Sequence, residues 1–111
     1  MAQQDHDVKV NITFRNTEST EAIKNYASEK LTHCLKKYVH HNTEAHLVLK
    51  IEKNRQIAEI TFHTDGADFI AKEETSDLYS SIDSLVHSVT HQLRKHKEKI
   101  TSHHAERPAL D

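Results

Sequence analysis

Four cationic side chains stand close together near the carboxyl end of the chain: Arg94, Lys95, Lys97 and Lys99. Glu98 is the one acid among them, so this short segment carries a net charge of +3. Such a charge suits the negative end of a helix dipole, but it exceeds what helix capping requires. In a chain without catalytic motifs the cluster indicates binding of a large anion, and nucleic acid is the anion that we expect.

Histidine is the second residue type that could take part in binding or catalysis, with 11 copies in 111 residues. His87 and His91 are four residues apart and could face one metal ion, as could the adjacent pairs at 40–41 and 103–104. Because the chain has one cysteine and no carboxylates grouped beside these positions, we interpret the histidines as solvated surface side chains. We expect no metal and no cofactor, and a histidine-rich metal or protein-interaction module stays open as an alternative.

Catalysis needs a nucleophile with a base, a glycine-rich phosphate loop or a metal triad, and the sequence contains none of these motifs. Asp77 and Asp83 resemble a catalytic pair, but six residues apart on a helix they point in different directions. We therefore expect a protein that is not an enzyme and has no small-molecule substrate.

Two amphipathic helices are predicted to position the charged residues. Residues 77–100 carry an apolar stripe at spacings of three, four and seven, with Asp77 as a capping residue. Residues 21–38 carry a second stripe after a Thr20 cap, and Cys34 on this stripe is expected to be buried. Lys30 falls within the same stripe, where a lysine must extend to solvent or pair with a carboxylate. Tyr79 could stack on a base, but we expect it to pack against the sheet.

Four segments show the alternation of apolar and polar residues that is typical of strands. They are residues 8–15, 45–52, 57–63 and 67–72, with tight turns at 53–56 and 64–66. The order β-α-β-β-β-α predicts a two-layer α+β sandwich, with both helices on one face of a four-stranded sheet and a polar opposite face. A right-handed crossover makes the first two strands parallel, and the turns make the other pairs antiparallel.

Length and charge set further limits. We expect one domain at residues 8–100, with flexible ends at 1–7 and 101–111. The net charge is −2, so a basic surface must arise from segregation of charge. No apolar run reaches the roughly 20 residues of a membrane span, and the lone cysteine fits a reducing compartment. A cytoplasmic protein without membrane contact is expected.

Several short motifs, in register over roughly residues 8 to 100, resemble those of one family. They are VNIT at 10–13, TEAI at 20–23, LKIEK at 49–53, DLYSSID at 77–83 and QLRKHK at 92–97. The family is that of the ribosome hibernation promoting factors and ribosome-associated inhibitors. The basic end of the last motif is closest to the short promoting form, without the C-terminal dimerisation domain of the long form.

The resemblance implies binding to the small ribosomal subunit and its rRNA, in the channel where messenger and transfer RNA sit, and inhibition of translation in stationary phase or stress. It implies ribosome dimers as the product, or single inactive ribosomes if the chain is a stand-alone inhibitor. By position, the RNA-binding residues implied are Lys24 and Lys30 in the first helix and Arg94, Lys95, Lys97 and Lys99 in the second. Ser88 and His91 stand where members commonly carry lysine or arginine.

Overall fold

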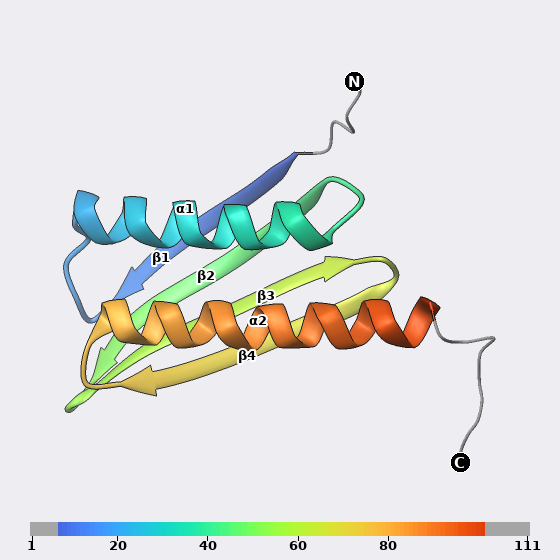
Figure 1. Cartoon of the computed structure of the whole chain (residues 1–111). Helices are drawn as coiled ribbons and strands as arrows, with labels where there is room; N and C mark the ends of the chain where they lie inside the picture. Colours follow the sequence, from blue (N-terminus) through green and yellow to red (C-terminus); the bar gives the residue numbers. More distant parts are fainter. Residues whose placement is uncertain (1–6, 102–111) are drawn as a thin grey trace, which may run out of the picture.

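The structure is a computed structural model that describes residues 7–101, with side chains as far as Lys97. The described residues form four strands and two helices in the predicted order (Figure 1). Their bounds are β1 Val8–Arg15, α1 Glu21–Tyr38, β2 Thr43–Glu52, β3 Arg55–Thr64, β4 Ala67–Thr75 and α2 Leu78–Thr101. Apart from Asp7 and Thr101, the two ends expected to be flexible lie outside the described residues.

The sheet has the strand order β1-β2-β3-β4. β1 pairs with β2 in parallel, and the two other pairs are antiparallel, as predicted. The second hairpin turn places both Asp65, at φ 53°, and Gly66, at φ 76°, in the left-handed region. That combination suits the primed turns whose twist matches paired strands, and an Asp-Gly pair adopts it with little strain.

The two helices run parallel to each other because of the strand directions. β1, β2 and β4 point the same way, and only β3 is reversed. α1 follows β1, α2 follows β4, and both helices return across the same face of the sheet (Figure 1). Their amino ends therefore lie at one end of the molecule and their carboxyl ends at the other.

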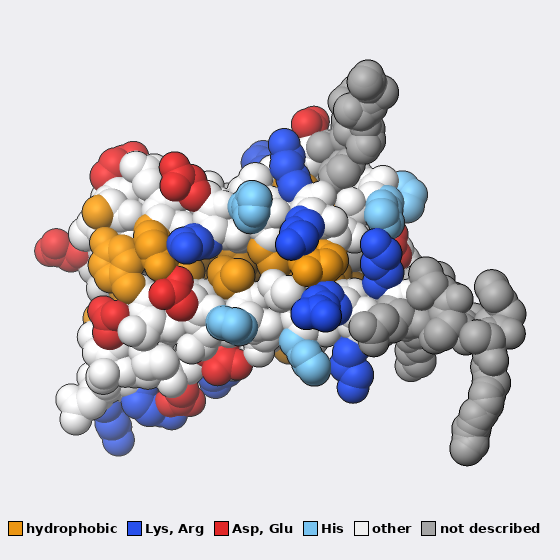
Figure 2. Space-filling view, viewed as in Figure 1, with side chains coloured by type: hydrophobic (Ala, Val, Ile, Leu, Met, Phe, Trp, Pro, Cys, Tyr) orange, Lys and Arg blue, Asp and Glu red, His pale blue; other side chains and the backbone are white. Residues whose placement is uncertain are grey.

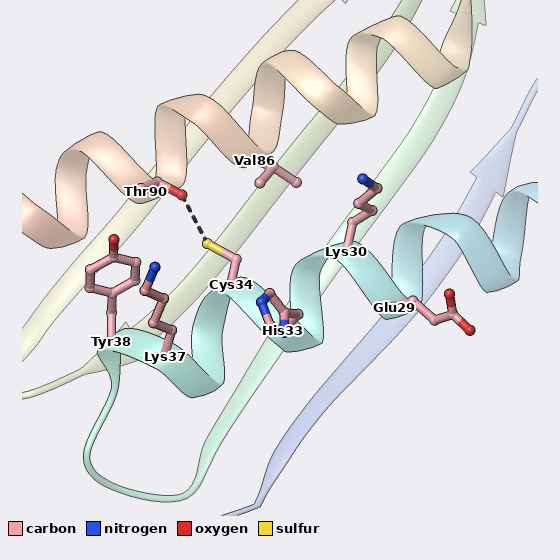
Figure 3. A pocket seen from close by; sticks show the side chains of 8 residues that line it. All are labelled: Glu29, Lys30, His33, Cys34, Lys37, Tyr38, Val86 and Thr90. Atoms are coloured by element: carbon pink, nitrogen blue, oxygen red, sulfur yellow. Dashed lines mark hydrogen bonds between the residues drawn. The ribbon is translucent and has the colours of Figure 1, made fainter.

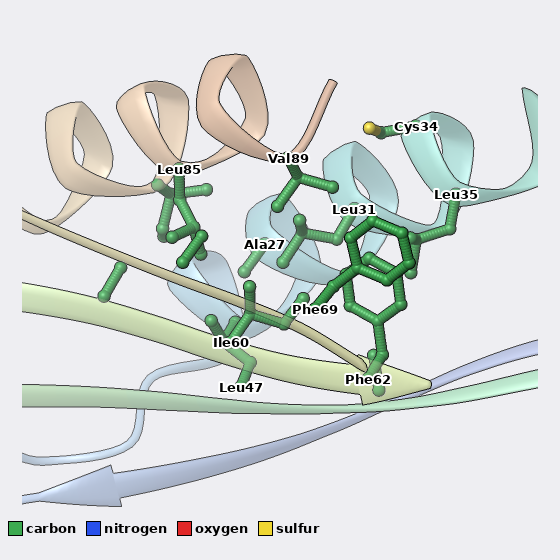
Figure 4. Close-up of a cluster of buried hydrophobic side chains, with 14 of the residues drawn as sticks. Ala27, Leu31, Cys34, Leu35, Leu47, Ile60, Phe62, Phe69, Leu85 and Val89 are labelled. Atoms are coloured by element: carbon green, nitrogen blue, oxygen red, sulfur yellow. The ribbon is translucent and has the colours of Figure 1, made fainter. Parts of the chain in front are cut away.

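The hydrophobic core fills the space between the helices and the sheet (Figure 4). Leu47 and Ile60 point into it from the strands, Leu31 and Leu85 from the helices, and all four are completely buried. Full burial of one such side chain stabilises the fold by about 1.5 to 3 kcal/mol relative to exposure. The arrangement confirms the predicted two-layer α+β sandwich.

β4 is longer than predicted, since it ends at Thr75 rather than Lys72. Its last residues pair with β3, and their polar side chains bind α2 instead of filling the core. Ser88 donates to Glu73 at 2.9 Å, and the hydroxyls of Thr75 and Ser81 lie 2.8 Å apart. Apolar alternation therefore stops before the strand does. β2 and β3 also extend one or two residues past their predicted ends, because backbone pairing does not require apolar side chains.

Candidate nucleic-acid interface

A hollow of about 530 Å³ lies in the seam between the two helices, which we call the groove (Figure 3). Its lining comes from both helices: Glu29, Lys30, His33, Cys34, Lys37 and Tyr38 of α1, and Val86 and Thr90 of α2. Cys34 is 4% exposed, as predicted, and its sulfur lies 3.2 Å from the Thr90 hydroxyl oxygen. Burial raises the pKa of this thiol, although the Thr90 hydrogen bond and the charge of Lys37 act in the opposite direction.

Two lysines of α1 point across the groove toward α2, whereas Glu29 points away from it (Figure 3). Lys30 is exposed and makes no ion pair with a described carboxylate; its Nζ lies 5.4 Å from the centre of the Tyr26 ring. Lys37 is exposed as well, with its Nζ 5.6 Å from the Tyr38 ring centre. A lysine on an aromatic face keeps its charge available to an incoming anion. Of the two readings that the sequence left open for Lys30, extension to solvent is the one observed.

The α2 side of the groove continues into the basic cluster. Arg94 lies four residues after Thr90, and Lys97 lies seven residues after Thr90. Both therefore share the face of α2 that lines the groove. Lys95 is exposed and turned by about 100° from Arg94 around the helix. The side chain of Lys99 lies outside the described residues.

Lys24, the remaining residue that the resemblance implied, does not line the groove. It is exposed on α1 and lies six residues before Lys30, which corresponds to a rotation of about 120° around the helix axis. Of the implied residues, the structure places Lys30 in the lining of the groove, whereas Arg94 and Lys97 continue beyond it along the same face of α2 and Lys24 lies on another part of the surface of α1.

Charge is polarised along the groove (Figure 2). Exposed carboxylates lie near the amino ends of the helices, and cations gather over their carboxyl halves with several histidines. The acids are Glu18, Glu21, Asp77 and Asp83, and the cations are Lys36, Lys37, Arg94, Lys95 and Lys97. The acids suit the positive amino ends of the helix dipoles, and the cations suit the negative carboxyl ends. Because the helices are parallel, the two carboxyl ends with their cations lie side by side.

The opposite face of the sheet also carries cations, and two of them pair with acids. Lys50 lies 3.7 Å from Glu52 and 3.8 Å from Glu59, and Arg55 lies 2.9 Å from Glu74. Among the described residues, Lys30, Arg94 and Lys95 form no ion pair of this kind. Lys30, Arg94 and Lys95 thus stay available on the helix face, although the net charge of the chain is negative.

Tyr79 corrects one prediction, because it does not pack in the core. Its side chain is 37% exposed, and its ring meets that of Tyr26 edge to face, with centres 5.0 Å apart and planes at 74°. The Tyr26 hydroxyl donates to Asp83 Oδ1 at 2.5 Å, and this hydrogen bond raises the pKa of Tyr26 above its ordinary value of 10.0. Two tyrosines thus bridge the helices at the amino end of the seam.

The histidines form no metal centre within the described part of the chain. There, no three histidine, cysteine or acidic side chains come together in a way that could hold an ion. His87 and His91 do share a surface hollow with Glu73 on the outer side of α2. The pair at 103–104 lies outside the described residues. Within the same part of the chain, neither helix is apolar enough over a sufficient length to cross a membrane.

Sequence reasoning missed Lys37 and His33 as groove residues. Both lie on the flank of the α1 stripe: His33 is three residues after Lys30 and Lys37 is seven, so they share its side of the helix. Extending the face from Lys30 by that spacing would have found them.

The fold and the groove together define a small α+β module with two parallel helices on a four-stranded sheet. The same fold is found in a ribosomal subunit interface protein from Coxiella burnetii, with a TM-score of 0.73 and 22% identity over 82% of this chain and 99% of that one. The crystal structure of the Thermus thermophilus Protein Y N-terminal domain matches with a TM-score of 0.70 and 30% identity, over 80% of this chain and 97% of that one.

Sequence comparison places the chain more narrowly. It belongs to the Sigma 54 modulation protein / S30EA ribosomal protein family, whose family model matches residues 10–101. A ribosome hibernation promoting factor from Salmonella typhimurium is 34% identical over 96 residues, which are 86% of this chain and all of that protein. One from Azotobacter vinelandii is 35% identical over 103 residues, or 92% of this chain and 95% of that protein. The resemblance seen in the sequence motifs is confirmed.

Proposed function

We propose that this chain is a cytoplasmic ribosome hibernation factor. It binds the small ribosomal subunit through rRNA, occupies the channel used by messenger and transfer RNA, and inhibits translation while ribosomes are inactive. Residues 8–100 act as one ribosome-binding domain. The proposal is supported by relatives named ribosome hibernation promoting factor, which this chain matches over nearly their whole length.

The observation that carries the proposal is that three exposed cations of the helix face, Lys30, Arg94 and Lys95, form no ion pair with a described carboxylate. Phosphate oxygens would meet Lys30 and Arg94 at the seam, with Lys95, Lys97 and Lys99 beside them and Lys24 as an outlying contact. Lys30, Arg94 and Lys95, which pair with no described carboxylate, gain more from a phosphate than cations that must first give up an ion pair. On the sheet face Lys50 and Arg55 are already paired, so these two cations are less available to a phosphate.

The mechanism is occupancy rather than catalysis. An inhibitor of this kind needs only affinity and a shape that excludes the competing RNA, and it releases the ribosome unchanged. The names of the relatives describe factors that promote hibernation, which agrees with a protein that acts by binding.

The test is sucrose-gradient sedimentation of the protein with isolated small and large subunits, with small subunits free or preloaded with messenger RNA and initiator transfer RNA. We expect migration with free small subunits and at least a severalfold loss on preloaded ones. Migration with large subunits, or binding that preloading leaves unchanged, would contradict the proposal.

The same gradients separate two forms of the proposal. Whole ribosomes that move into a dimer peak on addition of the protein indicate the promoting type, which we propose. Single ribosomes that stay inactive in translation without such a peak indicate the stand-alone inhibitor.

A further inference from the structure

Tyr79 is an unusual surface residue for this chain. Among the described residues, only Ile70 at 68% and Tyr79 at 37% are large apolar side chains left exposed. Ile70 lies on β4, an edge strand, and the Gln92 side chain donates to its carbonyl oxygen at 3.0 Å. Tyr79 instead lies at the seam between the two helices, where its ring contacts that of Tyr26.

Tyr26 holds Tyr79 from the other helix. The Tyr26 ring is fixed by the bond from its hydroxyl to Asp83 and by Lys30 near its ring, and Tyr79 packs against it edge to face. An aromatic ring braced in this way loses little side-chain entropy when a flat ligand stacks on it. The position is therefore preorganised as a stacking surface, and the core does not require it.

The surrounding charge selects what can stack there. Asp77 and Asp83 act electrostatically on Tyr26, so this end of the seam is negative. Beyond Lys30, beside Asp77 and Asp83, a phosphate is repelled, whereas a nucleobase is neutral and its amino groups can donate to carboxylates. Along α1, Tyr26 and Lys37 are separated by about 16 Å, so one RNA strand can reach both ends.

We propose that Tyr79, braced by Tyr26, stacks on an unpaired nucleobase of the RNA whose phosphates occupy the cationic end of the groove. This inference rests on the proposed function and adds an orientation to it: phosphate at the carboxyl ends of the helices, base at the amino ends. Tyr79 thereby favours single-stranded RNA over a duplex, in which bases are already stacked.

The test is the salt dependence of binding to small ribosomal subunits. Phosphate contacts set the slope of log Kd against log salt concentration. Stacking contributes to the binding free energy an amount that does not depend on salt. We expect Tyr79→Ala and Tyr79→Leu to weaken binding about tenfold at every salt concentration with an unaltered slope. Tyr79→Phe keeps the aromatic face and should restore binding.

Ile70→Ala is the matched control, since it removes the other exposed apolar side chain from the sheet face. It should bind as the wild type does. Tyr79→Leu retains apolar bulk, so its loss of binding with an unchanged melting temperature separates stacking from folding. If Tyr79→Leu binds as tightly as wild type, the stacking inference is overturned while the proposed function stands. If wild type itself fails to bind small subunits, the proposed function fails, and the stacking inference fails with it.

Discussion

Cys34 is the only cysteine of the chain, and its sulfur lies at the floor of the groove beside Thr90. Burial raises the pKa of the thiol above its ordinary value of 9.0. The thiol therefore stays neutral in the folded protein at a pH where the unfolded chain has begun to ionise. Its contribution to stability is fully present below about pH 9 and is lost as the pH rises through the raised pKa.

A comparison of wild type with Cys34→Ala tests whether the thiol makes stability fall as the pH rises. The variant should be less stable at neutral pH, because it loses buried volume. Between about pH 8 and pH 10 its free energy of unfolding should fall less steeply than that of wild type. Urea denaturation at a series of pH values measures both quantities. Parallel profiles would show that the thiol does not titrate differently in the two states.

At the residue scale, the sequence identified Lys30 as an anomaly but could not decide what it met. Periodicity gives an angle on a helix, and it does not say which neighbouring helix lies on that side. Tyr79 shows the same limit: its spacing is compatible with the core, yet the adjacent helix supplies Tyr26 at the seam and leaves the ring half-exposed. Contacts between helices decided both cases.

α2 begins at a side-chain cap. Asp77 Oδ2 accepts a hydrogen bond from the Ser80 backbone N–H at 3.0 Å, and its carbonyl accepts one from Ser81. A carboxylate in this position satisfies an orphan donor and also favours the positive end of the helix dipole. The predicted capping role of Asp77 agrees with this geometry.

Replacing the cap should cost stability in two separable steps. Asp77→Ala removes both the acceptor and the charge, and we expect it to destabilise the protein by about 1 kcal/mol. Asp77→Asn keeps an acceptor and should lose only a few tenths of that amount. Thermal unfolding of the three proteins checks the order. Equal losses in the two variants would mean that charge, rather than the cap, matters.

At the element scale, all strands and helices could be predicted because each carries its own period. The end of β4 could not, since Glu73 and Thr75 face α2 through hydrogen bonds and break the apolar alternation. Strand ends in this sheet follow backbone pairing, which leaves no mark on side-chain hydropathy.

At the scale of the whole molecule, topology converts a net charge of −2 into a cationic surface. Parallel helices bring Lys37 and Arg94, which are distant in sequence, to the same end of the molecule. Sequence analysis found the basic cluster of α2 but not its partner on α1, because the direction of the helices follows from sheet order. The prediction of the RNA-binding residues themselves awaits experiment.

Histidines on the helix face should make binding depend on pH. His33 lines the groove with Lys30, Lys37 and Glu29, and Thr90 faces it from α2. Histidine side chains in general become cationic as the pH falls below about 6.5. At fixed ionic strength, we expect small-subunit binding to be several times tighter at about pH 6 than at about pH 8. Equal affinity of wild type at the two pH values would refute this expectation.

The central claim is that the helix face, rather than positive charge anywhere on the surface, binds the small subunit. The most direct measurement is gradient co-sedimentation of wild type and two variants that each lose four positive charges. One replaces Arg94, Lys95, Lys97 and Lys99 by glutamine. The other replaces four exposed cations away from the groove by glutamine: Lys9, Arg15, Lys53 and Lys72. We predict that wild type and the second variant travel with small subunits while the first stays at the top of the gradient. Equal retention of both variants, or loss of both, would contradict the account.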